Sequence, residues 1–230
     1  MGRGLGREHG RPRQAVAAAV RDHRRAVADL RRADPVMAAI IDRVGPCKLG
    51  HPTDRGGPAP DHYGALVRSI VGQQLSVTAA RSILTKLYGR FDGRTPTPRQ
   101  ILADDPEALR AAAGLSRSKV AFLRDLAEHV ESGQLVLEAL DELSDEQVSE
   151  LLVQVKGIGQ WTVDMFLIFH LDRPDVLPVG DLGVRRAAMI EYSLRKLPEP
   201  PRLARLARPW QPWRSVGTWY LWASLRVTPQ

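Results

Sequence analysis

Residues 152–162 read LVQVKGIGQWT, and the chain reaches VGD at residues 179–181. Residues 156–159 hold two glycines and form a link between two segments of helical pattern that is too short for anything but a tight hairpin. The sequence therefore predicts a helix, a hairpin and a second helix over about residues 145–171. A helix that starts beside glycines presents outward-pointing amides, which suit a phosphate, although many helix pairs use glycine merely to turn.

Helical signals dominate on both sides of this hairpin, and alternating strand patterns are scarce. Helix starts and caps are expected at Asp34 with Pro35, Ser76, Asp105 with Pro106, Ser116, and Ser144 with Gln147. Further helices are expected at about residues 14–32, 63–71, 184–194 and 216–225. A loop rich in Gly and Pro is predicted at residues 50–60. The pattern as a whole predicts an all-α domain with about ten helices.

The composition is that of a folded globular protein. Of the 230 residues, 43% are hydrophobic, and no apolar run is long enough for a membrane span or a secretory signal. We therefore expect a cytoplasmic protein without membrane contact. The single cysteine, Cys47, excludes an internal disulfide and an iron-sulfur cluster held by four thiolates, and we expect it to be a small buried hydrophobic residue.

Charge is unevenly distributed along a chain whose net charge is +7. Residues 125–184 hold 13 acidic and 2 basic side chains, whereas residues 185–230 hold 9 basic and 2 acidic ones. This segregation fits a protein that turns one face to a polyanion such as nucleic acid. Residues 1–14, in which Gly and Arg are interleaved, are predicted to be a disordered basic tail.

Asp181 stands immediately before a segment of helical pattern, where an aspartate is most often an N-cap. Residues 152–162 followed by 179–181 nevertheless resemble the hairpin and catalytic aspartate of the helix-hairpin-helix DNA glycosylase superfamily, at the family's spacing. The stretches IVGQQLSV at 70–77 and PWRS at 212–215 are similar to its alkylpurine branch, the 3-methyladenine DNA glycosylase II type. The resemblance covers about residues 33–226.

This resemblance implies a fold and an activity. The fold is the all-α, two-lobed DNA glycosylase domain, here residues 15–230, with a cleft between the lobes. The activity is that of a monofunctional enzyme of base excision repair, which flips alkylated bases such as 3-methyladenine and 7-methylguanine out of double-stranded DNA and hydrolyses their N-glycosidic bonds. We expect it to act as a monomer in the bacterial cytoplasm or nucleoid.

The resemblance also assigns roles to three side chains. The Asp181 carboxylate would stabilise the positive charge that develops on the deoxyribose. Trp161 and Trp222 match aromatic positions of the base pocket, where a π face can hold a cationic base, and core packing is the alternative for both. The family places its lyase lysine at position 161, so an indole there predicts no strand cleavage. Met165 and Leu182 replace aromatic residues of the best-studied member, which leaves the range of bases open.

The DNA contacts implied by the resemblance come from several parts of the chain. They are Gly157, Gly159 and Thr162 in the hairpin, Gln74 as the wedge that fills the gap left by the flipped base, and Arg185, Arg186 and Arg214 on phosphates. An ordinary helix-terminal glutamine and surface ion pairs are the alternatives. No cofactor is expected beyond a monovalent cation, Na⁺ or K⁺, which the family holds through backbone carbonyls, here those of Val153, Val155 and Ile158.

Two other functions compete with this interpretation. One is a glycosylase of the same fold that removes an oxidised, mismatched or deaminated base. The missing lysine argues against the branches with lyase chemistry, and the missing cysteines argue against the branches that carry a cluster. The other is a non-catalytic module that uses the hairpin only to grip DNA. The complete motif around Asp181 argues against that module.

Overall fold

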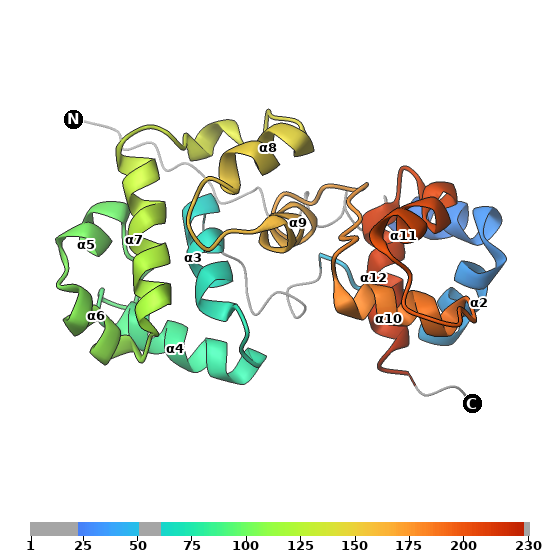
Figure 1. Ribbon diagram of the computed structural model, residues 1–230, viewed down its shortest axis with the longest axis horizontal. Coiled ribbons are helices and arrows are strands. Elements are labelled where there is room, and N and C mark those ends of the chain that lie inside the picture. Colours follow the sequence, from blue (N-terminus) through green and yellow to red (C-terminus); the bar gives the residue numbers. More distant parts are fainter. Residues whose placement is uncertain (1–22, 51–60, 228–230) are drawn as a thin grey trace, which may run out of the picture. The chain divides into compact units, whose positions relative to one another are not determined.

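The computed structural model describes residues 23–50 and 61–227, which form helices joined by turns and loops, with no strand among them (Figure 1). The predicted all-α class is therefore confirmed. The tail predicted at residues 1–14 and nearly all of the loop predicted at residues 50–60 lie outside the described residues.

The helices that follow the helical residues 23–33 have these bounds. In chain order they are α2 (Pro35–Val44), α3 (His62–Gly72), α4 (Val77–Gly89), α5 (Pro98–Ala103), α6 (Pro106–Ala113), α7 (Arg117–Glu131), η1 (Leu137–Ala139), α8 (Asp145–Leu152), α9 (Gln160–Phe169), α10 (Leu182–Glu191), α11 (Pro200–Leu206), η2 (Arg208–Trp210) and α12 (Arg214–Ser224).

The predicted helix starts are confirmed by their capping bonds. The side chains of Asp34, Ser76, Asp105 and Ser116 each accept a hydrogen bond from an amide in the first turn of the helix that they precede. Ser144 and Gln147 form the reciprocal pair of a capping box. The short helices α5 and α11 were not predicted, because six or seven residues are too few to show a helical period.

The contacts divide the chain into two compact units, as a two-lobed fold requires. Among the described residues, unit 1 comprises 23–50 and 179–227, and unit 2 comprises 61–178. Unit 1 therefore combines the two ends of the chain, whereas unit 2 is one continuous segment.

Unit 1 is organised around the buried carboxylate of Asp34. The Asp34 carboxylate caps α2 and accepts two further hydrogen bonds, from Tyr192 Oη at 2.6 Å and Trp210 Nε1 at 2.8 Å. Trp210 and Tyr220 are fully buried, and α12 packs against both α2 and α10 (Figure 1). The N-terminal helices are thus held to the C-terminal quarter of the chain by apolar burial and by one fully hydrogen-bonded acid.

Unit 2 is built on α7, its longest helix. This helix packs against α3, α5 and α6, and α9 packs against α3 and α8 (Figure 1). Leu123 and Leu126 of α7 are fully buried. The hairpin that joins α8 to α9 lies in this unit, so its backbone is supported by neighbouring helices.

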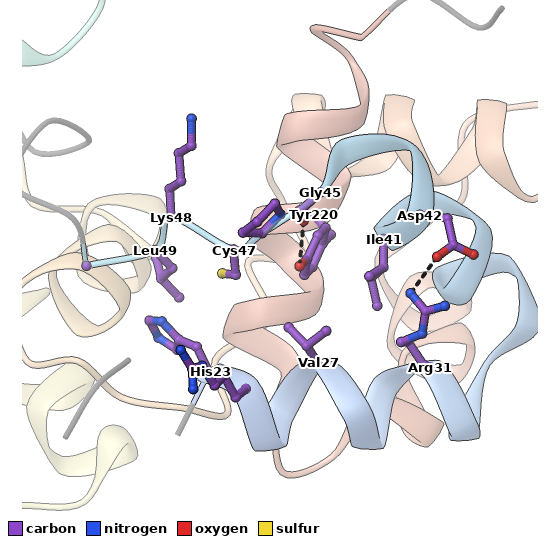
Figure 2. Close-up of a pocket in the computed structure, with 13 residues that line it drawn as sticks. His23, Val27, Arg31, Ile41, Asp42, Gly45, Cys47, Lys48, Leu49 and Tyr220 are labelled. Atoms are coloured by element: carbon purple, nitrogen blue, oxygen red, sulfur yellow. Dashed lines mark hydrogen bonds and ion pairs between the residues drawn. The ribbon is translucent and has the colours of Figure 1, made fainter. Parts of the chain in front are cut away.

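Unit 1 also contains a cavity of about 610 Å³ (Figure 2). Its wall includes the ion pair of Arg31 with Asp42 and the Tyr220 hydroxyl, which donates to Gly45 O at 3.0 Å. Cys47 lines this cavity and is half-buried, so the expectation that it is a buried hydrophobic residue was wrong. The lining residues do not include the candidate catalytic Asp181, and we assign the cavity no part in base release.

Candidate active site

The functional residues predicted from the sequence are divided between the two units. Gln74, the hairpin and Trp161 belong to unit 2, whereas Asp181, Trp222 and the arginines belong to unit 1. Each group has its own geometry.

Asp181 is held at the N-terminus of α10 by two hydrogen bonds to one oxygen. Its Oδ1 accepts from the amide of Val184 at 2.7 Å and from Trp222 Nε1 at 2.9 Å. The first bond makes Asp181 the N-cap of α10, which is the most common role of an aspartate that precedes a helix. The second bond ties the carboxylate to α12, from a residue 41 positions later in the sequence. Capping and a chemical role are therefore compatible for this residue.

Gly183 makes room for the pair of Asp181 and Trp222. A Cβ at position 183 would lie 3.1 Å from Asp181 Oδ1 and 3.3 Å from Trp222 Cδ1, closer than such atoms normally approach. Gly183 was not among the residues predicted from the sequence. The available signal was a glycine in the first turn of a helix, where it costs about 1 kcal/mol relative to alanine and therefore needs a reason.

The two candidate pocket tryptophans are not core residues. Trp222 is half-buried, and its indole N–H bonds the Asp181 carboxylate. The side chain of Trp161 is 48% exposed at the start of α9. Core packing, the alternative for both, does not describe them, and their contact with a base stays a prediction.

The hairpin turns at Gly157, which has a φ of +82°. A Cβ at this position would meet the Phe122 ring at 2.2 Å, so both the backbone conformation and the lack of space require glycine. Gly159 is the N-cap of α9 and has no side chain to cap the first amides of that helix. Thr162 is buried, with its hydroxyl 3.3 Å from Gln73 Nε2. The start of α9 thus has the features of an anion-binding helix terminus.

Asp125 of α7 anchors the first residue of the hairpin. Its carboxylate accepts a hydrogen bond from the Lys156 amide at 2.8 Å and forms an ion pair with Lys156 Nζ at 3.0 Å. Burial acts to raise the pKa of Asp125, but the bonds from Lys156 outweigh it and hold that pKa below its usual range. The buried carboxylate of Asp125 thus joins α7 to the backbone of the hairpin, and the largely exposed Lys156 ammonium pairs with the same carboxylate.

Gln74, the candidate wedge, lies in the turn between α3 and α4. It is exposed and has a φ of +58°, and its neighbours Leu75 and Val77 are 38% and 72% exposed. A turn that presents a long amide and two apolar side chains to solvent suits insertion into a base stack. The role of wedge stays a prediction for Gln74.

The three arginines differ in what they already bind. Arg185 donates to Pro198 O at 2.9 Å and pairs with Glu199 at 3.3 Å, so the ion-pair alternative describes its observed contacts. Arg186 is exposed on α10, and Arg214 is half-buried at the first position of α12. Phosphate contacts by these arginines stay predictions.

The cation implied by the family resemblance requires backbone oxygens, and the hairpin supplies them in a suitable place. Helix α8 ends at Leu152, with Val153 as its C-cap, so the negative end of the helix dipole is nearby. Val155 O accepts from the Ile158 amide at 3.0 Å and keeps a second lone pair. The donor set fits Na⁺ or K⁺, and its occupancy stays a prediction. Within the described residues, no cluster of His, Cys, Asp and Glu could hold a metal ion.

Comparison with known proteins decides the family. The model of the HhH-GPD superfamily of base excision DNA repair proteins matches residues 67–212. The chain belongs to the HhH-GPD superfamily. A curated relative, DNA-3-methyladenine glycosylase 1 of Schizosaccharomyces pombe, is 36% identical over 167 residues, which are 72% of this chain and 73% of the relative.

Two solved structures agree with this fold. The 3-methyladenine DNA glycosylase of Schizosaccharomyces pombe in complex with abasic DNA has a TM-score of 0.75 at 34% identity, over 86% of this chain and 95% of that one. The DNA-3-methyladenine glycosidase of Bacillus halodurans has a TM-score of 0.74 at 36% identity, over 86% and 87%. The predicted family and fold are therefore confirmed. No helix among the described residues of this HhH-GPD protein is both long and apolar enough to cross a membrane.

Proposed function

We propose that this protein is a DNA glycosylase that hydrolyses the N-glycosidic bonds of alkylated bases in double-stranded DNA, as a step of base excision repair. The observation that carries the proposal is the oriented carboxylate of Asp181, held by Val184 N and Trp222 Nε1, in a chain of the HhH-GPD superfamily. Relatives with 34% to 36% identity are named for 3-methyladenine, which supports alkylated purines as the substrate class.

The chemistry asks little of the protein beyond charge and position. Breaking an N-glycosidic bond leaves positive character on the deoxyribose, and a fixed carboxylate stabilises that charge. An alkylated purine is already a good leaving group and needs little general acid assistance. In our proposal Asp181 stabilises the sugar cation and orients the attacking water. The exposed indole of Trp161 would contact the base, because an aromatic face attracts a cationic ring, and a base contact by Trp222 stays a prediction.

The other parts of the proposed function concern the partner and the reaction's end point. Duplex DNA would be gripped by the uncapped start of α9, with the flipped base replaced by Gln74. Because Trp161 stands where a lyase would carry its lysine, the reaction ends with an abasic site and an intact strand. Action as a monomer in the cytoplasm stays a prediction.

The replacement Asp181→Asn tests the proposal, because asparagine keeps an oxygen that can accept from Val184 and Trp222 and is a good N-cap. The change removes the charge and little else. We expect base release from a duplex that contains 7-methylguanine to fall by about 100-fold or more under single-turnover conditions. Affinity for the duplex and the melting temperature should stay close to those of the wild type.

A matched control is Asp105→Asn. Asp105 is an N-cap of the same kind, which accepts from the Ala108 amide at 2.7 Å at the start of α6. This variant should release the base at the wild-type rate. Release by Asp181→Asn at a rate near that of the wild type would remove Asp181 from the mechanism. A set of duplexes with 3-methyladenine, 7-methylguanine, hypoxanthine, uracil or 8-oxoguanine tests the substrate class in the same assay.

A further inference from the structure

We propose that Gln73 is a positioning residue that ties the turn carrying Gln74 to the DNA-gripping hairpin, so that the wedge enters the base stack at a fixed distance from the gripped phosphate. This inference rests on the proposed function. It concerns only residues of unit 2, whose relative positions the structure gives.

The side-chain amide of Gln73 reaches two parts of the hairpin motif at once. Nε2 donates to Gly157 O at 2.7 Å and lies 3.3 Å from Thr162 Oγ1. The two partners are 84 and 89 residues away in the sequence, at the turn of the hairpin and in the first turn of α9. One side chain therefore connects the end of α3 to both sides of Gly159, the N-cap of α9.

The backbone of the same turn is held by Lys119 of α7. Its Nζ donates to Val71 O at 2.7 Å and to Gln73 O at 3.0 Å, where the helix dipole of α3 places partial negative charge. Burial lowers the pKa of the Lys119 ammonium. Both the main chain and the side chain of Gln73 are thus fixed, while the adjacent Gln74 projects into solvent.

Helix α7 supports the turn and the hairpin from one face. Lys119, Phe122 and Asp125 follow one another at intervals of three residues, so they lie on neighbouring turns of the helix. Lys119 holds the turn after α3, Phe122 fills the space beside Gly157, and Asp125 binds Lys156. Gln73 adds the direct link between the two supported segments.

This link matters because base flipping requires two contacts with one duplex. The hairpin must hold the backbone while the wedge replaces the extruded base, and the cost of unstacking is recovered only if both contacts form together. Small displacements of a positioning group reduce catalysis strongly, because the reacting geometry must be held within about half an ångström. Loss of the Gln73 bonds should therefore impair extrusion more than simple binding.

The test compares Gln73→Met, which keeps length and loses the donor, with the wild type. We expect affinity for an undamaged duplex to stay within about twofold, and release of 7-methylguanine paired with cytosine to fall about tenfold, the scale of a lost hydrogen bond. The same lesion placed opposite an abasic-site analogue costs less to extrude, because no base pair has to be broken. Its release by Gln73→Met should recover to within about threefold of the wild type. Gln134→Met, a change at an exposed glutamine after α7, is the matched control and should behave as wild type.

A second measurement uses the protein without DNA. Amide hydrogen exchange in Gln73→Met should be faster at residues 72–76 and at residues 156–162, with exchange in unit 1 unchanged. Equal loss of release from paired and unpaired lesions, or unchanged exchange in both segments, would overturn the positioning role. If the wild type released no base, the proposed function would fail, whereas the exchange experiment would still decide the link.

Discussion

The tightest packing of the hairpin lies at Gly157, and it gives the sharpest stability prediction. A methyl group there meets two separate penalties. The residue has a φ of +82°, where a side chain costs about 1 to 2 kcal/mol, and the new Cβ would lie 2.2 Å from Cδ2 of the Phe122 ring. Relieving such an overlap costs about 1 to 3 kcal/mol in a packed region. Gly157→Ala should therefore destabilise the protein by about 2 to 5 kcal/mol.

Gly133 supplies the matched control within the same unit. It has a φ of +76°, but a Cβ there would find nothing within 4 Å. Gly133→Ala should pay only the conformational penalty of about 1 to 2 kcal/mol. The difference between the two variants measures the contact with Phe122, and Phe122→Ala combined with Gly157→Ala should show a coupling of about 0.5 to 3 kcal/mol.

The assay is urea unfolding followed by circular dichroism, with the free energy of unfolding extrapolated to water for each variant. Equal losses for Gly157→Ala and Gly133→Ala would refute the argument, because the two sites would then differ in nothing but position. Additive effects of Gly157→Ala and Phe122→Ala would refute it too, since no contact would couple them.

Three further predictions concern chemistry and pH. Changing Trp161 to Leu should slow the release of cationic 7-methylguanine by about 0.5 to 2 kcal/mol more than that of neutral hypoxanthine, and equal losses with a lower melting temperature would return Trp161 to a packing role. For Trp222→Leu the same difference should be added to a loss common to both lesions, because this change also removes the Nε1 donor to Asp181. Borohydride should trap no covalent complex with DNA, because Trp161 offers no amine, and a trapped adduct would contradict a purely hydrolytic mechanism. Because the pKa of Asp125 is lowered in the folded protein, its contribution to stability is present above the ordinary carboxyl value of about 3.9 and is lost as the pH falls through the lower folded value. Asp125→Asn should therefore be less stable than the wild type at pH 7, and the gap between their urea midpoints should narrow below pH 4.

Local features of the fold could be predicted because their causes lie within a few residues. Asp105 with Pro106 starts α6, and Gly114 ends it in the left-handed conformation. Ser144 and Gln147 begin α8 by bonding each other's backbone. In each case the two capping partners are at most four residues apart, so the sequence contains the whole interaction. The predicted end of α9, at about residue 171, was two residues too late, because helix ends depend on surrounding contacts.

The site could be predicted only in part, because its contacts join distant segments. The sequence motif identified Asp181 as a candidate, but its hydrogen bond to Trp222 joins residues 41 positions apart and could not be predicted from the motif. The bond of Gln73 to Gly157 crosses 84 residues, and no short-range pattern reveals it. Arg185 looked available from its position, whereas its guanidinium is engaged by Pro198 and Glu199. Tertiary packing, and not local pattern, decides all three.

The buried bonds of Asp34 bear on how the chain is made. Its partners Tyr192 and Trp210 are 158 and 176 residues away in the sequence. These two hydrogen bonds to Asp34 therefore cannot form until most of the protein has left the ribosome. Residues 55–178 are contiguous and have their partners available earlier. Synthesis from the N-terminus would therefore let the middle of the chain assemble first, while the opening helices wait for the last fifth to emerge. The order of assembly would be the reverse of the order in which these two segments begin to appear.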